Sequence, residues 1–313
     1  MTLPGYNHKF GQQIMTDIEG VDIDRAFLAH YHIAAADAPA GSSDGVHAAM
    51  NLGAAVQAIT TGITNPAVPR NIRIKGNVAG INGVVKITGT NFADEVITEN
   101  ITANGTSAKD GLLAFKTVTK IDLPIQNHTP AAQTETIEVT HGCSTAGDLP
   151  VVVTAGTLLG DPVTVTVPVT TDMDTVTEVA AAVVAGLNAD ETISAVFTAS
   201  NAEGVITLAA KTPLANDSTL SIAFTVGSTG VTVGSSTNGT TGVPYDQISV
   251  GWGDKFGIPY KLYANELVIL KLLNKAKEST EGTVTADATN LAKNVYDPND
   301  TTLGADIDLY IIV

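Results

Sequence analysis

The residues best suited to chemistry in this chain are histidines, and two of them stand one residue apart. His30 and His32 flank Tyr31 in the stretch 24–32, DRAFLAHYH. In a strand, alternate residues point to the same face, so both imidazoles could bind one transition-metal ion. No third ligand is recognisable nearby in the sequence. We therefore assign the pair to packing or to an interface, and we expect no metal site.

Two other clusters carry weaker signals for metal binding. His141 and Cys143 flank Gly142 without the ligand spacing of a zinc site. Residues 297–300, DPND, offer oxygen ligands of the kind that calcium uses. They lack the twelve-residue loop with a terminal glutamate, so we interpret them as a polar turn.

The sequence gives little support for nucleophilic catalysis or phosphate binding. Residues 41–45, GSSDG, match Gly-x-Ser-x-Gly letter for letter, but we interpret them as a flexible turn. There is no Gly-x-x-x-x-Gly-Lys-Ser/Thr, and 251–255, GWGDK, has neither the spacing nor a following helix. Paired carboxylates occur throughout so acidic a chain, so their presence does not identify a catalytic site. We expect no catalytic residue, no cofactor and no enzymatic activity.

The overall charge excludes several classes of partner. The 313 residues carry a net charge of −16, which argues against nucleic acid because phosphate binding needs clustered Lys and Arg. The same charge repels anionic membranes, and no run of 18 apolar residues occurs. The single cysteine, Cys143, excludes an internal disulfide, and residues 1–20 show no signal-peptide pattern. These features fit synthesis in a reducing cytosol.

An abrupt change in composition interrupts the chain. A strand is predicted over residues 115–124, ending there, and the strand that should follow it in the fold is predicted at 246–255. Between them, residues 130–242 contain eleven acidic side chains and one basic one, Lys211, and so hold −10 of the net charge. This predicts an acidic domain at 130–242 that folds separately, inserted at a loop tip of a host domain. Such a displayed module suits a structural protein better than a compact enzyme.

The predicted host domain comprises residues 58–129 and 243–313 and is expected to be mainly β, a sandwich or barrel-like fold. Residues 71–76 and 83–90 alternate in polarity, and Asn82-Gly83 between them is a hairpin signal. Residues 267–273, LVILKLL, are the most apolar run and are expected to form a buried strand. The lone Trp252 is assigned to the core or to a subunit interface.

The remaining segments are an N-terminal arm and the interior of the insert. Residues 1–57 are polar and irregular, so we expect an extended arm that docks on a neighbouring subunit. Its single anchoring element is expected at 24–32, as a strand or short helix, and 45–58 is expected to be a loop or short helix. The insert is expected to be a small α+β, Ig-like domain with one helix, opened by the capping-box pair Thr175 and Glu178. Its expected strands are 134–140, 163–167, 194–200, 205–210 and 220–226.

One stretch of the host domain resembles a known signature. Residues 61–72, TGITNPAVPRNI, resemble the TNP-x-VPRN signature of a family of tailed-bacteriophage virion proteins. Residues 87–91 with 98–105, then 114–124, then 248–260 are similar to further segments of that family in the same order. The family's last two segments lie much closer together, which favours reading the intervening residues as an addition.

The resemblance covers residues 60–125 and 245–313 and implies a capsid decoration, or cement, protein. Residues 164–211 also look like small β-rich modules of phage tail and capsid-associated proteins. A protein of this kind is expected on the capsid surface of the virion, as a homotrimer bound to the major capsid protein, after synthesis in the bacterial cytoplasm. The resemblance brings no catalytic residues. The residues expected at capsid or subunit contacts are Phe27, His30, Tyr31, Asn65, Pro66, Pro69, Arg70 and Trp252.

Two alternatives stay open at this point. One is a tail or neck component, such as part of a tube or fibre. The other is a host-surface-binding module whose insert binds glycans, which the sequence disfavours because Phe197 and Phe224 are the only aromatic residues between 130 and 242.

Overall fold

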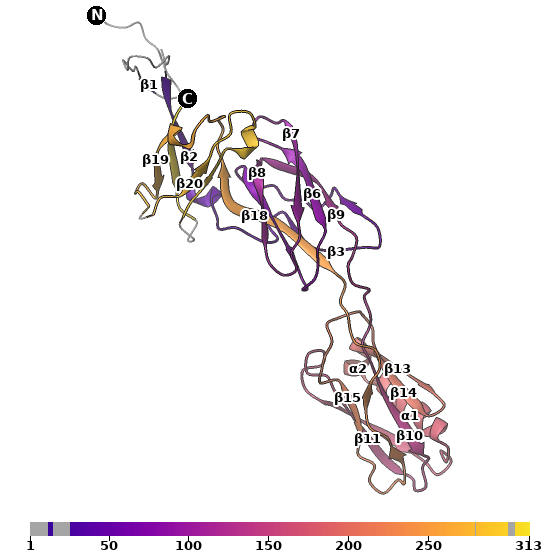
Figure 1. Ribbon diagram of the computed structural model, residues 1–313. Coiled ribbons are helices and arrows are strands. Elements are labelled where there is room, and N and C mark those ends of the chain that lie inside the picture. The colour runs from indigo at the N-terminus through magenta and orange to yellow at the C-terminus, as the bar shows by residue number, and fades with distance from the viewer. Residues whose placement is uncertain (1–11, 15–25, 279, 300–303) are drawn as a thin grey trace, which may run out of the picture. The chain divides into compact units, whose positions relative to one another are not determined.

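The computed structural model describes residues 12–14, 26–278, 280–299 and 304–313. Within these residues the chain is mainly β, with several sheets and two α-helices. It divides into two compact units (Figure 1): the first comprises Met1–Asn127 with Asp246–Val313, and the second comprises His128–Tyr245. No helix in the described residues has the length and apolar character needed to cross a membrane.

The first unit consists of strands and three short 3-10 helices. Its elements are β1 (Gln12–Ile14), β2 (Ala26–Ile33), η1 (Ala35–Asp37), β3 (His47–Asn51), β4 (Gln57–Ile59), β5 (Arg70–Gly76), β6 (Val84–Thr90), β7 (Val96–Thr102), β8 (Lys109–Phe115), β9 (Thr117–Leu123), β18 (Gln247–Gly257), η2 (Asn265–Leu267), β19 (Val268–Leu273), β20 (Thr283–Thr285), η3 (Leu291–Lys293), β21 (Val295–Asp297) and β22 (Ile307–Ile312).

Two sheets of this unit share one core. One has the order β20-β21-β18-β5-β8, with β3 also paired to β18, and the other has the order β4-β9-β6-β7. Because side chains alternate along each strand, β5 and β18 direct Ile72, Ile74 and Val250 inward, where they meet Ile87 and Ile121 of the other sheet. The long strand β18 runs through the first sheet and pairs with β5 along most of its length (Figure 1).

A third sheet, ordered β1-β2-β22-β19, covers a separate core. Strand β2 pairs with β22 in antiparallel register, which sets His32 opposite Asp308. Alternation along β2 buries Ala29 and Ile33 and leaves the two histidines on the other face. The distal half of β18 also contributes, since Phe256 lies in this core.

The described part of the predicted arm differs from the expectation. Within residues 26–57, β2 pairs with β22 and β3 pairs with β18 of the same chain, so these residues belong to the sheets of the first unit. The reason is that the apolar face of β2 finds a partner in the C-terminal strand, which is distant in sequence. Residues 45–58, expected as a loop or short helix, contain β3. The rest of the arm, 1–11 and 15–25, lies outside the described residues.

The strand predicted at 267–273 is present as β19, but it is not a buried strand. Val268 and Leu273 are buried, whereas Ile269 is 51% exposed. Strand β19 lies at the edge of its sheet, so it has a partner strand on one side only.

The second unit combines two sheets with two helices. Its elements are β10 (Thr134–His141), β11 (Gly147–Thr154), β12 (Val163–Val169), α1 (Val176–Ala189), α2 (Glu191–Val196), β13 (Phe197–Ala202), β14 (Val205–Ala210), β15 (Ser221–Phe224), β16 (Thr232–Val233) and β17 (Thr237–Asn238).

The core of this unit is formed by the sheets β13-β14-β10-β16 and β12-β11-β15 together with one face of α1. The helix begins with the expected capping box: Thr175 Oγ1 accepts from the Glu178 backbone N–H, and the Thr175 backbone N–H donates to the Glu178 carboxylate. The predicted strand 194–200 is partly helical, because Asp190 accepts from the N–H groups of Thr192 and Ile193 and so caps α2. The strand β13 begins only at Phe197.

Candidate functional site

Three of the residues expected at a partner surface are buried within this chain. These residues are Pro66, Pro69 and Arg70. Their side chains are not available to a partner in this conformation, which corrects that part of the expected contact set. Sequence position in a recognisable motif did not distinguish a contact residue from a packing residue.

The Arg70 guanidinium holds several segments of the first unit together. Its Nη1 donates to the carbonyl of Pro39 at 2.7 Å, and its guanidinium carbon lies 4.4 Å from the centre of the Phe256 ring. Arg70 Nη2 lies 3.7 Å from the Asp254 carboxylate. Burial lowers the pKa of Arg70 to about 10, opposed by the attraction of Asp254. The side chain is therefore a positively charged internal tie at neutral pH.

Other residues of the same segment also serve packing. The exposed Asn65 accepts a hydrogen bond from the backbone N–H of Val118 at 2.7 Å through its side-chain oxygen. The buried Asn71 accepts from the Lys255 N–H at 3.0 Å and donates to the Gly111 carbonyl at 3.3 Å. Residues 61–72 and 248–260, both singled out by the resemblance, thus meet in one place.

Trp252 is half-buried and packs against the core of the sandwich. A Cβ added to Gly45 would lie 2.6 Å from the Trp252 ring, so the backbone at residue 45 lies directly over the indole. The indole Nε1 is buried and has no hydrogen-bond partner. Trp252 was expected either in the core or at a subunit interface, and this packing corresponds to the core role.

Phe27 and Tyr31 are half-buried residues of β2. The Tyr31 ring meets the Phe92 ring edge-on, with 5.9 Å between their centres. Burial raises the pKa of Tyr31 above its ordinary value, so the phenol is neutral at physiological pH. The expected contact residues that retain exposed surface are Phe27, Tyr31, His30, Asn65 and Trp252.

The histidine pair lies beside an aspartate from the opposite end of the chain. His30 Nε2 is 2.7 Å and His32 Nδ1 is 2.8 Å from the same oxygen, Asp308 Oδ1. Both histidine side chains are about half exposed, at 47% and 46%, whereas that of Asp308 is 10% exposed. Tyr310 stacks on His30 with 4.6 Å between ring centres, which restrains the orientation of that imidazole.

The charge state of Asp308 follows from these contacts. Burial raises its pKa, but the hydrogen bonds from His30 and His32 outweigh burial and hold the pKa below its usual value. An ionised carboxylate only accepts hydrogen bonds, so both facing ring nitrogens act as donors. Sequence reasoning missed Asp308 because 276 positions separate it from His32. The available signal was one acid within the apolar C-terminal strand.

The described residues of the other two candidate clusters do not come together as metal ligands. His141 Nδ1 is 3.0 Å from the Thr232 hydroxyl, and the buried Cys143 thiol donates to the carbonyl of Thr145 at 3.1 Å. Asp297 lies in β21, 3.7 Å from the Lys255 amine. Asp300 lies outside the described residues.

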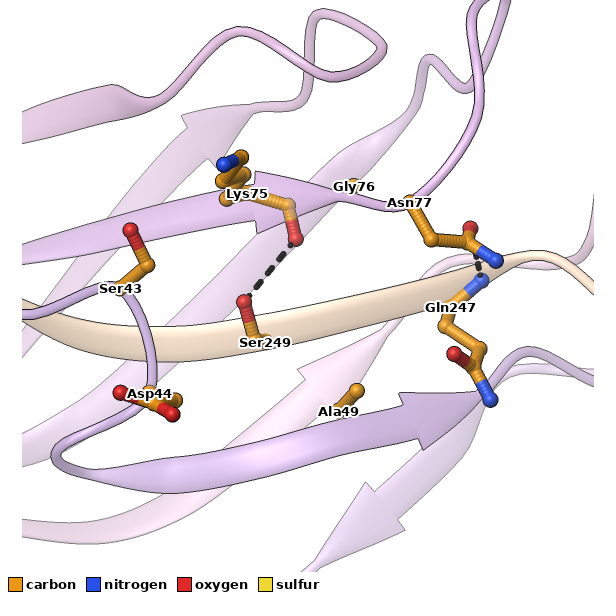
Figure 2. Close-up of a pocket in the computed structure, with 8 residues that line it drawn as sticks. All are labelled: Ser43, Asp44, Ala49, Lys75, Gly76, Asn77, Gln247 and Ser249. Atoms are coloured by element: carbon orange, nitrogen blue, oxygen red, sulfur yellow. Dashed lines mark hydrogen bonds between the residues drawn. The ribbon is translucent and has the colours of Figure 1, made fainter.

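A depression of about 500 Å³ lies beside the start of β18 (Figure 2). Ser249 Oγ donates to the Lys75 carbonyl at 3.3 Å, and the Gln247 N–H donates to the Asn77 side chain at 2.8 Å. The residues lining it are Ser43, Asp44, Ala49, Lys75, Gly76, Asn77, Gln247 and Ser249. The ionisable side chains in this lining are Lys75 and Asp44, and Asp44 accepts a hydrogen bond from the Ser42 hydroxyl at 2.7 Å.

Comparison with known proteins adds no identification. No protein-family model matches the chain, and no curated protein matches it.

Proposed function

We propose that the chain is a structural protein of a tailed-phage virion, which decorates the capsid exterior by binding the assembled lattice of the major capsid protein. The observation that carries this proposal is the division into two units, in which a self-contained acidic β unit interrupts a loop of a β host. A module carried in this way can be displayed without disturbing the surface that holds the host in place.

The packing of the resembling segments supports the same proposal. Asn71 and Lys255, from two segments that are far apart in sequence, are joined by a hydrogen bond in the first unit. The resemblance therefore concerns residues of one scaffold and not a scatter of short matches. The Ig-like character of the second unit belongs to the proposal as well.

The proposed mechanism is mass action. A protein that binds only the assembled shell stabilises it by about 2.7 kcal/mol per site when its free concentration is about one hundred times Kd. A homotrimer at a three-fold position would multiply this effect. Phe27, His30, Tyr31 and Asn65 are the exposed or half-buried residues that we propose for the contact.

Cryo-electron microscopy of virions, with and without this protein, tests the proposal. We expect extra density at three-fold or local three-fold positions of the capsid. Density confined to the tail or neck would replace the proposal with a tail component. Particles that show no density for the protein anywhere would overturn a structural role.

Removing the second unit tests the division of labour between the units. The Asn127 backbone N–H donates to the Asp246 carboxylate at 2.6 Å, so a short Gly-Ser turn can join the two residues in place of 128–245. We expect the shortened protein to bind capsids as the full chain does. Circular dichroism of the shortened protein controls for folding, and a folded protein that fails to bind would contradict this assignment.

A further inference from the structure

We propose that His30, His32 and Asp308 form a binding site for one divalent transition-metal ion, with zinc the best fit. The site does not depend on the proposed virion function. In the part of the chain that the structure describes, this is the only group of three such side chains whose ligand atoms all lie within 4.8 Å of one another.

The backbone places the three ligands where one ion can reach them. His30 and His32 share the outer face of β2, and Asp308 is the direct partner of His32 across the ladder with β22. All three therefore project from two adjacent hydrogen-bonded strands, which fixes their Cα positions. The Tyr310 ring stacked on His30 restrains the most exposed ligand.

The three ligand atoms already lie near one another. Zinc binds imidazole nitrogen and carboxylate oxygen at about 2.0–2.2 Å in a tetrahedron, which separates neighbouring ligand atoms by about 3.3 Å. The present nitrogen-to-oxygen distances are 2.7 and 2.8 Å, and all three atoms lie within 4.8 Å of one another. Side-chain rotations that lengthen the nitrogen-to-oxygen distances and bring the two nitrogens to a similar separation would admit the ion.

The donor set selects the class of metal. Two imidazoles with one carboxylate suit zinc, cobalt, nickel or copper, whereas calcium and magnesium prefer sites made of oxygen alone. Because both histidine side chains are about half exposed, the fourth position is open to water. A site with three protein ligands and water in the fourth position is a known zinc arrangement.

The test uses the full chain without an affinity tag, stripped of metal and titrated with Co²⁺ and then Zn²⁺. We expect one Co²⁺ per chain, with the strong visible absorption of a tetrahedral site, and displacement of Co²⁺ by Zn²⁺. We also expect Zn²⁺ to raise the melting temperature, because it binds the folded state. Absence of saturable Co²⁺ or Zn²⁺ binding would overturn the proposal.

Three variants remove the ligands while keeping the present hydrogen bonds. His30→Gln places an amide N–H near the position of Nε2, His32→Asn does so for Nδ1, and Asp308→Asn keeps an oxygen acceptor. Each should weaken Co²⁺ binding by at least about tenfold, since even loss of groups that only support the ligands costs about 10–100-fold. Because each variant keeps a hydrogen-bond partner, folding is expected to be retained and is checked by circular dichroism.

Matched controls come from two of the other described histidines. His47→Gln and His141→Gln alter imidazoles of the first and second units that hydrogen-bond elsewhere, to Ala48 and Thr232. Both should bind Co²⁺ as the unmodified protein does. Equal binding by all five variants would show that the metal binds elsewhere, and the proposal would fail.

Discussion

The side-chain amide of Asn71 occupies the space beside Gly253 in which any other residue would place its Cβ. A Cβ at residue 253 would lie 2.4 Å from Asn71 Nδ2 and 2.6 Å from Oδ1. The pairing of β5 with β18 is irregular between Trp252 and Phe256, and Asn71 Oδ1 accepts the Lys255 N–H there. A side chain thus replaces a ladder bond at a bulge, and glycine makes the close approach possible.

Gly253→Ala should therefore destabilise the first unit. Overpacking of a tight site costs about 1–3 kcal/mol, and the atoms in contact belong to a fully buried side chain. Urea unfolding measures the loss. Gly53→Ala is the matched control, because its nearest contact is the mobile end of the Gln57 side chain. A loss of equal size in both variants would contradict the packing argument.

Asp287 should make stability depend on pH in the acid range. It accepts hydrogen bonds from the Asn290 N–H and from the N–H and hydroxyl of Thr289, which hold its pKa well below the ordinary value. A pKa depressed by folding stabilises the protein above the unfolded value of about 3.9, and that contribution is lost as the pH falls through the folded value.

The variant Asp287→Asn isolates this contribution. It should be less stable than the unmodified protein at pH 7, and the difference should shrink steadily as the pH is lowered below about 4. Urea unfolding at a series of pH values measures the difference. A difference that stays constant across the series would show that the carboxylate charge is not the cause.

The capping box of α1 should contribute measurably to the second unit. Thr175→Ala removes the hydroxyl that accepts from the Glu178 N–H, and loss of such a cap costs about 0.5–2 kcal/mol. Thr177→Ala is the control, because Thr177 is a solvent-exposed residue of α1 and alanine is the better helix former. Thermal unfolding should rank Thr175→Ala lowest, and the reverse order would contradict the assignment of the cap.

Residues 128–245 should fold as an isolated protein. They have their own core, and the two ends are joined because Ala131 and Val243 exchange two backbone hydrogen bonds of 2.9 Å. Circular dichroism and cooperative urea unfolding of the isolated segment test this expectation. Broad, non-cooperative unfolding of the segment would show that it depends on the rest of the chain.

Local patterns in the sequence predicted much of the fold. Alternation of polarity indicated the mainly β class and many strand positions. This signal is local, because successive residues of a half-buried strand point in turn to the core and to solvent. The capping box at Thr175 and Glu178 was readable for the same reason, since its hydrogen bonds span three residues. The change in composition marked residues 130–242, and the contacts divide the chain at His128 and Tyr245.

Long-range pairing, by contrast, was decided only by the tertiary structure. Alternation in β2 shows that one face must be buried, but it does not identify β22 as the partner strand. For that reason the sequence suggested an arm, and Asp308 could not be joined to His30 and His32. Arg70 was mistaken for a contact residue because its burial depends on Pro39 and Phe256, which are supplied by distant segments. Local periodicity determines which side chains of each segment must be buried. Only the packing of the whole chain determines which other segments cover them.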